Sequence, residues 1–256
     1  MMSKLLRTAQ TYVPPLVDAK AWAQRTYRRT MRIPSETSYK AIARFPLEPG
    51  KAFVDIGANR GQTIESIRLY RAADPIVSFE PNPRLAQRLV QRYRSDWNLT
   101  VNAFGLGIEP GEFNLHVPSY RGFVFDGLAS FEREAAQDWL NAERIYGFDP
   151  RLVTVETVRC EIRRWDDVDT SPGFVKIDVQ GFESNVLRGG IETIRRHRPV
   201  FVIENDETRA HEAILFAEDY RRAAYDGTRF VLDKIGADNT FYIPADKAER
   251  ILAAYP

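Results

Sequence analysis

The sequence predicts a doubly wound α/β fold, in which a mostly parallel sheet carries helices on both faces and has an antiparallel C-terminal edge. Short apolar runs, rich in branched and aromatic residues, alternate with helical patterns of about ten residues. The first run ends in a glycine turn between Gly57 and Gly61, and a helical pattern starts directly after the turn. Strands that alternate with helices in this way are joined by crossover connections, which make neighbouring strands parallel.

The first half of the pattern is regular. Strands are predicted over residues 52–56, 76–79 and 99–104, and helices over residues 62–71 and 84–94. The residues expected on the buried sides of these helices are Ile64, Ile67, Leu69, Leu85, Leu89 and Val90. The spacing therefore predicts three parallel strands with a helix after each of the first two.

The second half contains an insert before the regular pattern returns. Residues 105–170 are irregular, with strand-like segments at 111–118 and 152–162 and a partly helical segment at 126–142. We expect this insert to shape a substrate pocket, because loops on a rigid scaffold commonly carry specificity. A strand over 174–178, a helix over 183–196 and a strand over 199–204 follow. The tail predicts two antiparallel edge strands, around 230–232 and 240–243.

Residues 1–45 are predicted to form an N-terminal helical extension to a domain that spans residues 46–256. Segment 16–31 reads as an amphipathic helix with an aromatic stripe and a basic face. Its stripe and its basic face consist of Val17, Trp22, Ala23, Tyr27, Arg25, Arg28 and Arg29. Ser35 and Ser38 can start a second short helix toward Phe45. Two interpretations stay open: the helices cap one edge of the core, or the basic face contacts an anionic carrier or a membrane surface.

The composition limits the classes of protein. The chain has 256 residues, with 36 Lys and Arg against 35 Asp and Glu, so no global field favours nucleic acid. Its single cysteine, Cys160, excludes an intramolecular disulfide and a cysteine metal cluster. No apolar run approaches the roughly 20 residues of a membrane-spanning helix. We expect a soluble protein of the cytoplasm.

The glycine turn differs from the common phosphate-binding turns. A dinucleotide turn needs Gly-x-Gly-x-x-Gly, and a P-loop needs Gly-Lys-Ser/Thr, whereas Gly57 and Gly61 are separated by three residues. Asp55 precedes the turn and is unfavourable for a pyrophosphate but favourable for a cationic ligand. Glu80 ends the second strand 23 residues after Gly57, where a carboxylate can accept both hydroxyls of a ribose. Together these residues favour S-adenosylmethionine, which is a cationic adenosyl compound.

Further acidic residues follow the later strands. Asp178 follows the strand over 174–178, and Gly181 and Glu183 begin the next helix. Because parallel strands end at one edge of a sheet, we expect Asp178 to face the same crevice as Asp55 and Glu80. Asp178, Glu204 and Asn205 could supply oxygen ligands for Mg²⁺, although polar residues at strand ends are common without a metal. Glu183 could equally complement the dipole of its helix.

Four ordered motifs resemble the FkbM family of S-adenosylmethionine-dependent methyltransferases, which have a Rossmann-like sheet. They are Asp-Ile-Gly-Ala-Asn-x-Gly at 55–61, Glu-Pro-Asn-Pro at 80–83, Val-Lys-Ile-Asp-Val-Gln-Gly-Phe-Glu at 175–183, and Arg-Pro-x-x-x-x-Glu at 198–204. Val-Leu-Arg-Gly-Gly at 186–190 extends the third motif. Gln180 stands where the family commonly has Glu, and Trp165 where it usually has Leu. The match spans residues 53 to 204 with gaps.

The resemblance implies methyl transfer from S-adenosylmethionine to a hydroxyl oxygen of a sugar, a glycolipid or a secondary metabolite. It implies that the methionine end of the cofactor is held at Asp55, Gly57, Ala58, Asn59 and Gly61. Glu80 would hold the ribose, and Asn82 would lie near the adenine. Asp178 and Glu183 would face the acceptor. A hydroxyl is a weak nucleophile, so a base or a metal must help to remove its proton, and Asp178, Glu183 and Glu204 are the acidic candidates.

The motifs of two other enzyme classes are absent. A short-chain dehydrogenase needs Tyr-x-x-x-Lys, and none of the eleven tyrosines has Lys four residues on. Nucleic-acid methyltransferases need Asn/Asp-Pro-Pro-aromatic or Pro-Cys, and both are absent, which disfavours nucleic acid as substrate. The alternative from another class is a non-catalytic module that binds the cofactor or a glycan within a biosynthetic complex.

Of the histidines, His197 is expected as a cation at a helix end, and His116 and His211 fall in the insert and the tail.

Overall fold

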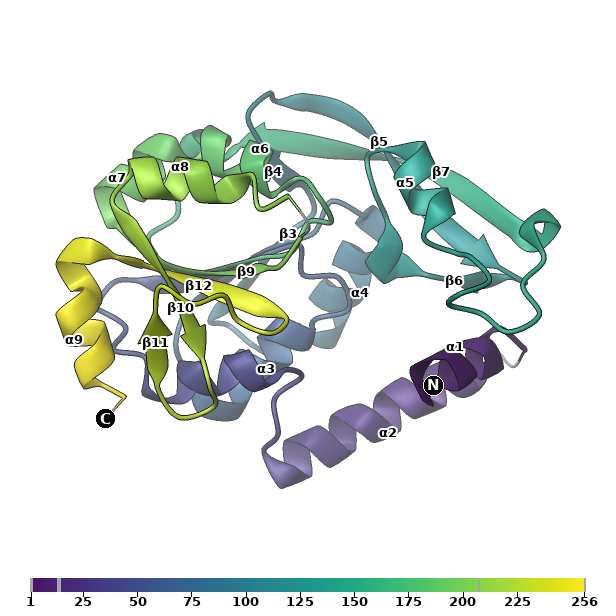
Figure 1. The fold of residues 1–256 in the computed structure, drawn as a ribbon, viewed down its shortest axis with the longest axis horizontal. Helices are drawn as coiled ribbons and strands as arrows, with labels where there is room; N and C mark the ends of the chain where they lie inside the picture. Colours follow the sequence, from purple (N-terminus) through teal and green to yellow (C-terminus); the bar gives the residue numbers. More distant parts are fainter. Residues whose placement is uncertain (1, 13–14, 207, 256) are drawn as a thin grey trace. The chain divides into compact units, whose positions relative to one another are not determined.

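A computed structural model describes residues 2–12, 15–206 and 208–255 (Figure 1). The chain forms two compact units. Unit 1 consists of Met1–Arg32 and Glu112–Cys160, and unit 2 of Ile33–Gly111 and Glu161–Pro256. The domain boundary at residue 45 and the insert over 105–170 stay predictions from sequence.

Unit 2 is built on an eight-stranded sheet whose strand order is β11-β10-β12-β9-β8-β1-β2-β3. In that order the strands are Phe230–Leu232, Tyr220–Tyr225, Asn239–Pro244, Val200–Glu204, Pro172–Ile177, Ala52–Ile56, Ile76–Phe79 and Leu99–Asn102. The pairs from β9 to β3 are parallel, whereas β12 is antiparallel to β9 and to β10. The predicted mostly parallel sheet with an antiparallel C-terminal edge is therefore confirmed.

Two hydrophobic clusters cover the two faces of this sheet. Along β1, Phe53 packs into one cluster, and Val54 and Ile56 pack into the other, as the alternation of a strand requires. The first face is covered by η1 (Thr37–Arg44), α3 (Gln62–Tyr70), α4 (Pro83–Arg92) and α9 (Ala248–Ala253). The second face is covered by η4 (Trp165–Asp167), α6 (Glu183–Gly189), α7 (Ile191–His197) and α8 (His211–Ala217). Helices on both faces make the fold doubly wound (Figure 1).

Some predicted elements differ from the structure. Val90 is 51% exposed, and Ala86 takes its inward position on α4. The helix predicted over 183–196 is split at Gly190, where a Cβ atom would come within 2.2 Å of the Trp165 ring, so the glycine permits close packing. The strand predicted over 99–104 stops at Asn102, and Gly105–Gly107 (β4) joins a second sheet. The tail holds three strands, together with α8, α9 and η5 (Ala245–Lys247), which were not predicted.

Unit 1 contains α1 (Met2–Tyr12), α2 (Pro15–Met31) and most of the insert. The insert supplies β5 (Gly111–Tyr120), β6 (Phe123–Val124), η2 (Asp126–Leu128), α5 (Arg133–Asp138), η3 (Pro150–Leu152) and β7 (Val153–Arg164). The second sheet has the order β4-β7-β5-β6. The helix predicted over 16–31 is confirmed as α2, whereas the side chains of Val17 and Trp22 lie outside the described residues. Among the described helices, none is both long and apolar enough to cross a membrane.

Candidate functional site

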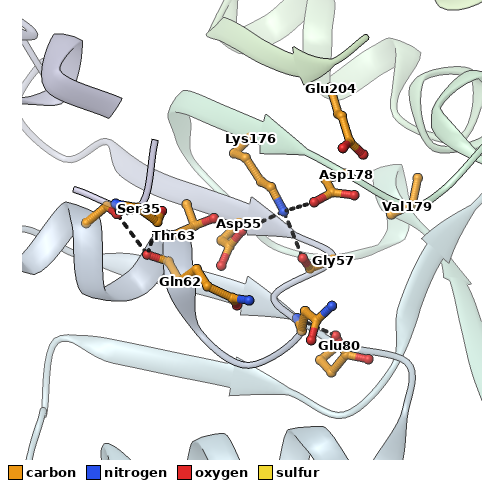
Figure 2. Close-up of polar contacts among 12 residues, drawn as sticks. Ser35, Asp55, Gly57, Gln62, Thr63, Glu80, Lys176, Asp178, Val179 and Glu204 are labelled. Carbon is orange, nitrogen blue, oxygen red and sulfur yellow. Dashed lines mark hydrogen bonds and ion pairs between the residues drawn. The ribbon is translucent and has the colours of Figure 1, made fainter. Parts of the chain in front are cut away.

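Four neighbouring parallel strands of unit 2 end at one edge of the sheet, and this edge collects most of the predicted site residues (Figure 2). Asp55 is the fourth residue of β1, Glu80 follows β2, Asp178 follows β8, and Glu204 ends β9. In register, Asp55 lies beside Ser78 of β2 and Lys176 of β8. The parallel arrangement therefore brings together carboxylates that are up to 149 residues apart in sequence.

The turn after β1 is a tight structure that only glycine permits at its first position. Gly57 has a φ of +82°, and a Cβ atom there would lie 1.9 Å from the Asp178 carbonyl oxygen. The backbone N–H groups of Gly57 and Ala58 both donate to the Phe79 carbonyl oxygen at 3.0 Å. Gly61, with a φ of +87°, precedes the first residue of α3. The turn is thus fixed against the ends of both β2 and β8.

Lys176 lies at the centre of this edge, and sequence analysis gave it no role. Its ammonium group donates to the Gly57 carbonyl oxygen at 2.8 Å. It also forms ion pairs with Asp55 Oδ1 at 3.6 Å and Asp178 Oδ2 at 3.4 Å, and the residue is only 4% exposed (Figure 2). Burial acts to lower the pKa of Lys176, but the carboxylates of Asp178 and Asp55 outweigh it and raise the pKa. A lysine inside an apolar strand was the available signal, because a buried charge needs a partner.

Asp55 is completely buried, and neither of its carboxylate oxygens has a hydrogen-bond partner among the described residues. Burial raises its pKa, and Lys176 offsets this effect only in part. An unsatisfied buried carboxylate is costly, and such groups are concentrated where a ligand or a catalytic role accounts for them. The Oδ1 atom of Asn59, in the adjoining turn, is likewise buried without a hydrogen-bond partner.

Glu80, which follows β2, connects the glycine turn to the helix α4. Its two oxygens accept the N–H groups of Asn59 at 2.6 Å and Asn82 at 2.8 Å, so the carboxylate joins the glycine turn to the start of α4. Burial raises the pKa of Glu80 to about 7, although these two hydrogen bonds act against the shift. The Asn82 side chain accepts the N–H of Arg84 at 3.1 Å and therefore caps α4.

Asp178 and Glu204 form a bridged pair of carboxyl groups. The Gln180 amide donates to Asp178 Oδ1 and to Glu204 Oε2, each at 2.8 Å. Burial and the negative charge of Asp178 raise the pKa of Glu204 to about 8. Burial also acts to raise the pKa of Asp178, but Lys176 and the hydrogen bonds from Glu204 and Gln180 outweigh it and lower the pKa. Gln180, where the family commonly has Glu, thus supplies the donor between the two carboxyl groups.

Glu183 and Asn205 are engaged in local hydrogen bonds. Glu183 Oε1 accepts the N–H groups of Val179 and Gly181 at 3.2 Å and holds the loop that follows β8. The Asn205 side chain accepts from Thr240 Oγ1 at 2.6 Å and donates to the Gly236 carbonyl oxygen at 2.9 Å. Its amide oxygen is therefore occupied away from Asp178 and Glu204. Among the described residues, no group of three His, Cys, Asp or Glu side chains is arranged to hold a metal, so the Mg²⁺ hypothesis has no support.

The segment before β1 adds two residues that sequence analysis missed. Ser35 N donates to Ser66 Oγ at 3.0 Å, which fixes this segment to α3. Glu36 lies within electrostatic range of Lys176 and Asp178, and burial raises its pKa. The buried Tyr39 hydroxyl accepts from Thr63 Oγ1 at 3.4 Å, and burial raises its pKa as well. The sequence predicted a short helix in this segment but no role in the site, because the contacts depend on the three-dimensional fold.

The histidines lie outside this set of contacts. His197 ends α7 as predicted, and burial and the nearby Lys51 lower its pKa, which acts against the expected positive charge. Its Nδ1 atom lies 2.7 Å from Lys51 Nζ. His211 begins α8 and shares a hydrogen bond with the Tyr242 hydroxyl at 2.9 Å. His116 lies in β5 of unit 1.

The sheet order, the glycine turn after β1 and the carboxylates after β2, β8 and β9 define a Rossmann-like fold of the methyltransferase type. A model of the Methyltransferase FkbM domain matches residues 55–225, so the chain belongs to the FkbM methyltransferase family. The predicted resemblance is confirmed. The segment with Glu36 and Tyr39, and β12, lie outside the matched residues.

The chain is also similar to one curated protein and to two solved structures. The chain is 26% identical over 165 residues to the 2-O-methyltransferase NoeI of Sinorhizobium fredii, a match that covers 62% of this chain and 65% of that protein. It resembles the methyltransferase FkbM of Methylobacillus flagellatus with 18% identity and a TM-score of 0.46, over 75% of this chain and 43% of that chain. It also resembles a SAM-dependent O-methyltransferase of Thermotoga maritima with 11% identity and a TM-score of 0.38, over 83% and 66% of the two chains.

Proposed function

We propose that this protein is an S-adenosylmethionine-dependent methyltransferase that methylates a hydroxyl oxygen of a sugar, a glycolipid or a secondary metabolite. The observation that carries the proposal is the buried carboxylate of Asp55, which has no hydrogen-bond partner among the described residues and lies beside the glycine turn. An anionic group in this position suits a ligand that carries an ammonium group and a sulfonium. The name of the relative NoeI, a 2-O-methyltransferase, favours oxygen as the atom that is methylated.

The residues at the edge fit the cofactor. Asp55 and the turn formed by Gly57, Ala58, Asn59 and Gly61 would hold the methionine end, because the buried oxygens of Asp55 and Asn59 have no hydrogen-bond partner among the described residues. Glu80 would accept the ribose hydroxyls, since each of its oxygens takes a single N–H and keeps a lone pair. Asn82 would lie near the adenine. When bound, the cofactor supplies a methyl group that its positive sulfur makes ready for displacement.

Lys176 would hold the glycine turn and the end of β8 in place relative to each other. It holds the Gly57 carbonyl oxygen and lies between Asp55 and Asp178, so it fixes the turn relative to the end of β8. Its charge also keeps Asp178 ionised, because it lowers the pKa of that carboxyl. We assign Lys176 a positioning role, since its ammonium group already has three partners.

On the acceptor side, Glu204 is the best candidate for the group that takes the hydroxyl proton. Its pKa of about 8 is close to a neutral working pH, where a general base is most effective. Asp178 would stay ionised beside Glu204, and Gln180 keeps the two carboxyl groups together. Glu183 is less suited, because its Oε1 atom holds the loop at 179–181.

Titration calorimetry with S-adenosylmethionine tests the cofactor assignment. We expect Glu80→Gln to weaken binding about 10- to 100-fold, because one charge-assisted hydrogen bond is lost. The affinity of the wild type should fall as the pH decreases below about 7, where Glu80 gains a proton, and the variant should lose this dependence. Glu218→Gln is the matched control, since Glu218 accepts two hydrogen bonds from Arg195 outside the site.

An unchanged dissociation constant in Glu80→Gln would show that Glu80 does not bind the cofactor. If the wild type does not bind S-adenosylmethionine, the whole proposal is rejected. Catalysis is tested by transfer of labelled methyl groups from S-adenosylmethionine to extracts of glycans and glycolipids. A wild type that binds the cofactor and labels none of these extracts would favour the non-catalytic module instead.

A further inference from the structure

The first 32 residues differ in charge from the rest of the chain. They contain seven Lys and Arg and one Asp, whereas the remaining 224 residues contain 29 basic and 34 acidic residues. The near-zero net charge of the whole protein therefore conceals a strongly basic segment. This segment forms α1 and α2 of unit 1.

The C-terminal half of α2 has no buried side chain among its described residues. From Ala23 to Met31 every side chain is exposed or half-buried. Ala23, Tyr27 and Met31 follow one another at intervals of four and therefore lie along one side of the helix. Tyr27 is 59% exposed and Met31 56% exposed, and Arg28 and Arg29 stand beside them. Most helices gain their stability from packing of an apolar side, so this surface suits a partner.

The helix α1 presents a second set of exposed apolar side chains. Lys4 Nζ donates to the Ala142 carbonyl oxygen at 2.6 Å, and the Tyr146 N–H donates to Thr8 Oγ1 at 2.9 Å, so one side of α1 is fixed within unit 1. Leu5 and Tyr12 remain 61% and 57% exposed. Large exposed apolar side chains and cations thus occur together on both helices.

Unit 1 also holds cations that are not neutralised by carboxylates. The guanidinium groups of Arg7 and Arg144 lie 4.8 Å and 4.0 Å from the centre of the Trp139 ring. Within the part of the chain that the structure describes, neither pairs with a carboxylate. The positive charge of α1 is therefore not cancelled by its own contacts in the insert.

We propose that the exposed side chains of α1 and α2, namely Leu5, Tyr12, Tyr27, Arg28, Arg29 and Met31, bind the surface of a membrane that contains anionic lipids. Apolar side chains of this size can enter the boundary between headgroups and acyl chains, while arginines beside them reach the phosphate groups. Nucleic acid would use the cations but leave Leu5 and Met31 exposed. The partner that uses both kinds of side chain is a lipid surface.

Co-sedimentation of the full chain with vesicles tests this proposal. We expect binding to vesicles that mix phosphatidylcholine and phosphatidylglycerol in equal parts, and little binding to phosphatidylcholine alone. Each basic residue near an anionic surface contributes about fivefold, so Arg28→Gln/Arg29→Gln should weaken binding about 25-fold. Glutamine preserves helix propensity, which circular dichroism will check. Tyr27→Ala/Met31→Ala should weaken binding about tenfold. This loss should depend less on salt than the loss caused by the arginine substitutions.

The matched control is Arg88→Gln/Arg94→Gln, which removes the same charge from exposed positions of unit 2 on and after α4. It should bind vesicles as the wild type does. Equal losses in the two arginine double variants would show that only the net charge of the protein matters. Equal binding to both vesicle types would show that anionic lipid is not needed. Either result overturns the proposal. Tighter binding to RNA than to the mixed vesicles, or a dimer that Tyr27→Ala/Met31→Ala dissolves, would overturn it in favour of another partner.

Discussion

The two units hold their charged side chains in opposite ways. In unit 2, Asp55, Glu80 and Lys176 are almost completely buried, and their pKa values are displaced. In unit 1, Lys4 and Arg121 lie over the rings of the exposed Tyr146 and Tyr12, which requires little loss of water. Buried charges lower stability unless the surrounding structure compensates them. The difference indicates that unit 2 loses some stability by burying the charged groups of the candidate site. Unit 1 keeps its cations near the surface, where they can contact other molecules.

The largest expected effect is that of removing the central cation of unit 2. Lys176→Met should lower the free energy of unfolding by about 3–5 kcal/mol, because it leaves Asp55 and Asp178 without their buried partner. Urea unfolding monitored by circular dichroism measures the loss. Binding of S-adenosylmethionine should be lost with it, since the Gly57 turn is no longer fixed to β8.

Lys247→Met is the matched control for this prediction. Lys247 also pairs with a carboxylate, Glu48 at 3.5 Å, and donates to a carbonyl oxygen, that of His197 at 3.1 Å, but it is partly exposed. Lys247→Met should lower the free energy of unfolding by less than about 1 kcal/mol. Adding Asp55→Asn to Lys176→Met should restore part of the stability, because it removes one uncompensated charge. Similar losses for the two lysines would mean that the buried Asp55 and Asp178 depend on Lys176 no more than the partly exposed Glu48 depends on Lys247.

The glycine turn allows a second comparison between the units. Gly57→Ala should lower stability by about 2–4 kcal/mol, because it combines a left-handed backbone with a Cβ atom against the Asp178 carbonyl. Gly147 in unit 1 has a φ of +61° and no atom within 4 Å of a Cβ position, so Gly147→Ala should lose only about 1–2 kcal/mol. Thermal unfolding of both variants gives the difference. Equal losses would show that the turn can move away from β8 without penalty.

Much of unit 2 could be predicted because each strand is an apolar run with a polar residue at its end. Asp55, Glu80, Asp178 and Glu204 were brought together by one rule, that parallel strands end at the same edge of a sheet. The partners of these residues could not be predicted in the same way. The role of Lys176 depends on the register between β1 and β8, which sets two segments separated by more than 100 residues side by side.

The errors have similar physical causes. Val90 was expected inside because of its side chain, but the orientation of α4 turns Ala86 inward. The strand β10 and the helix α8 were missed because the tail has no clear alternation, so tertiary pairing with β11 and β12 decides the structure of β10. Unit 1 was the least predictable region, since its apolar clusters combine residues of β5 and β7 with residues of the irregular segment between these strands.

The smallest expected effect concerns the charge of Glu204. Its pKa is about 8 in the folded protein and near its ordinary value of 4.5 when unfolded. Between these values the folded state binds more protons than the unfolded state, so the contribution of Glu204 to stability falls as the pH rises from about 4.5 to about 8. Glu204→Gln removes this dependence and can still accept the hydrogen bond from Gln180.

Above pH 8 the Glu204→Gln variant should therefore be more stable than the wild type, by about 1 kcal/mol after allowance for the partial exposure of the side chain. Near pH 5 the two should unfold at similar temperatures. Glu218→Gln should show the opposite sign, because Arg195 lowers the pKa of Glu218 and the charge stabilises the fold above the unfolded pKa. If Glu204→Gln behaves like Glu218→Gln, then the pKa of Glu204 is not raised in the folded protein, and its carboxylate is a weaker base than the proposed function requires.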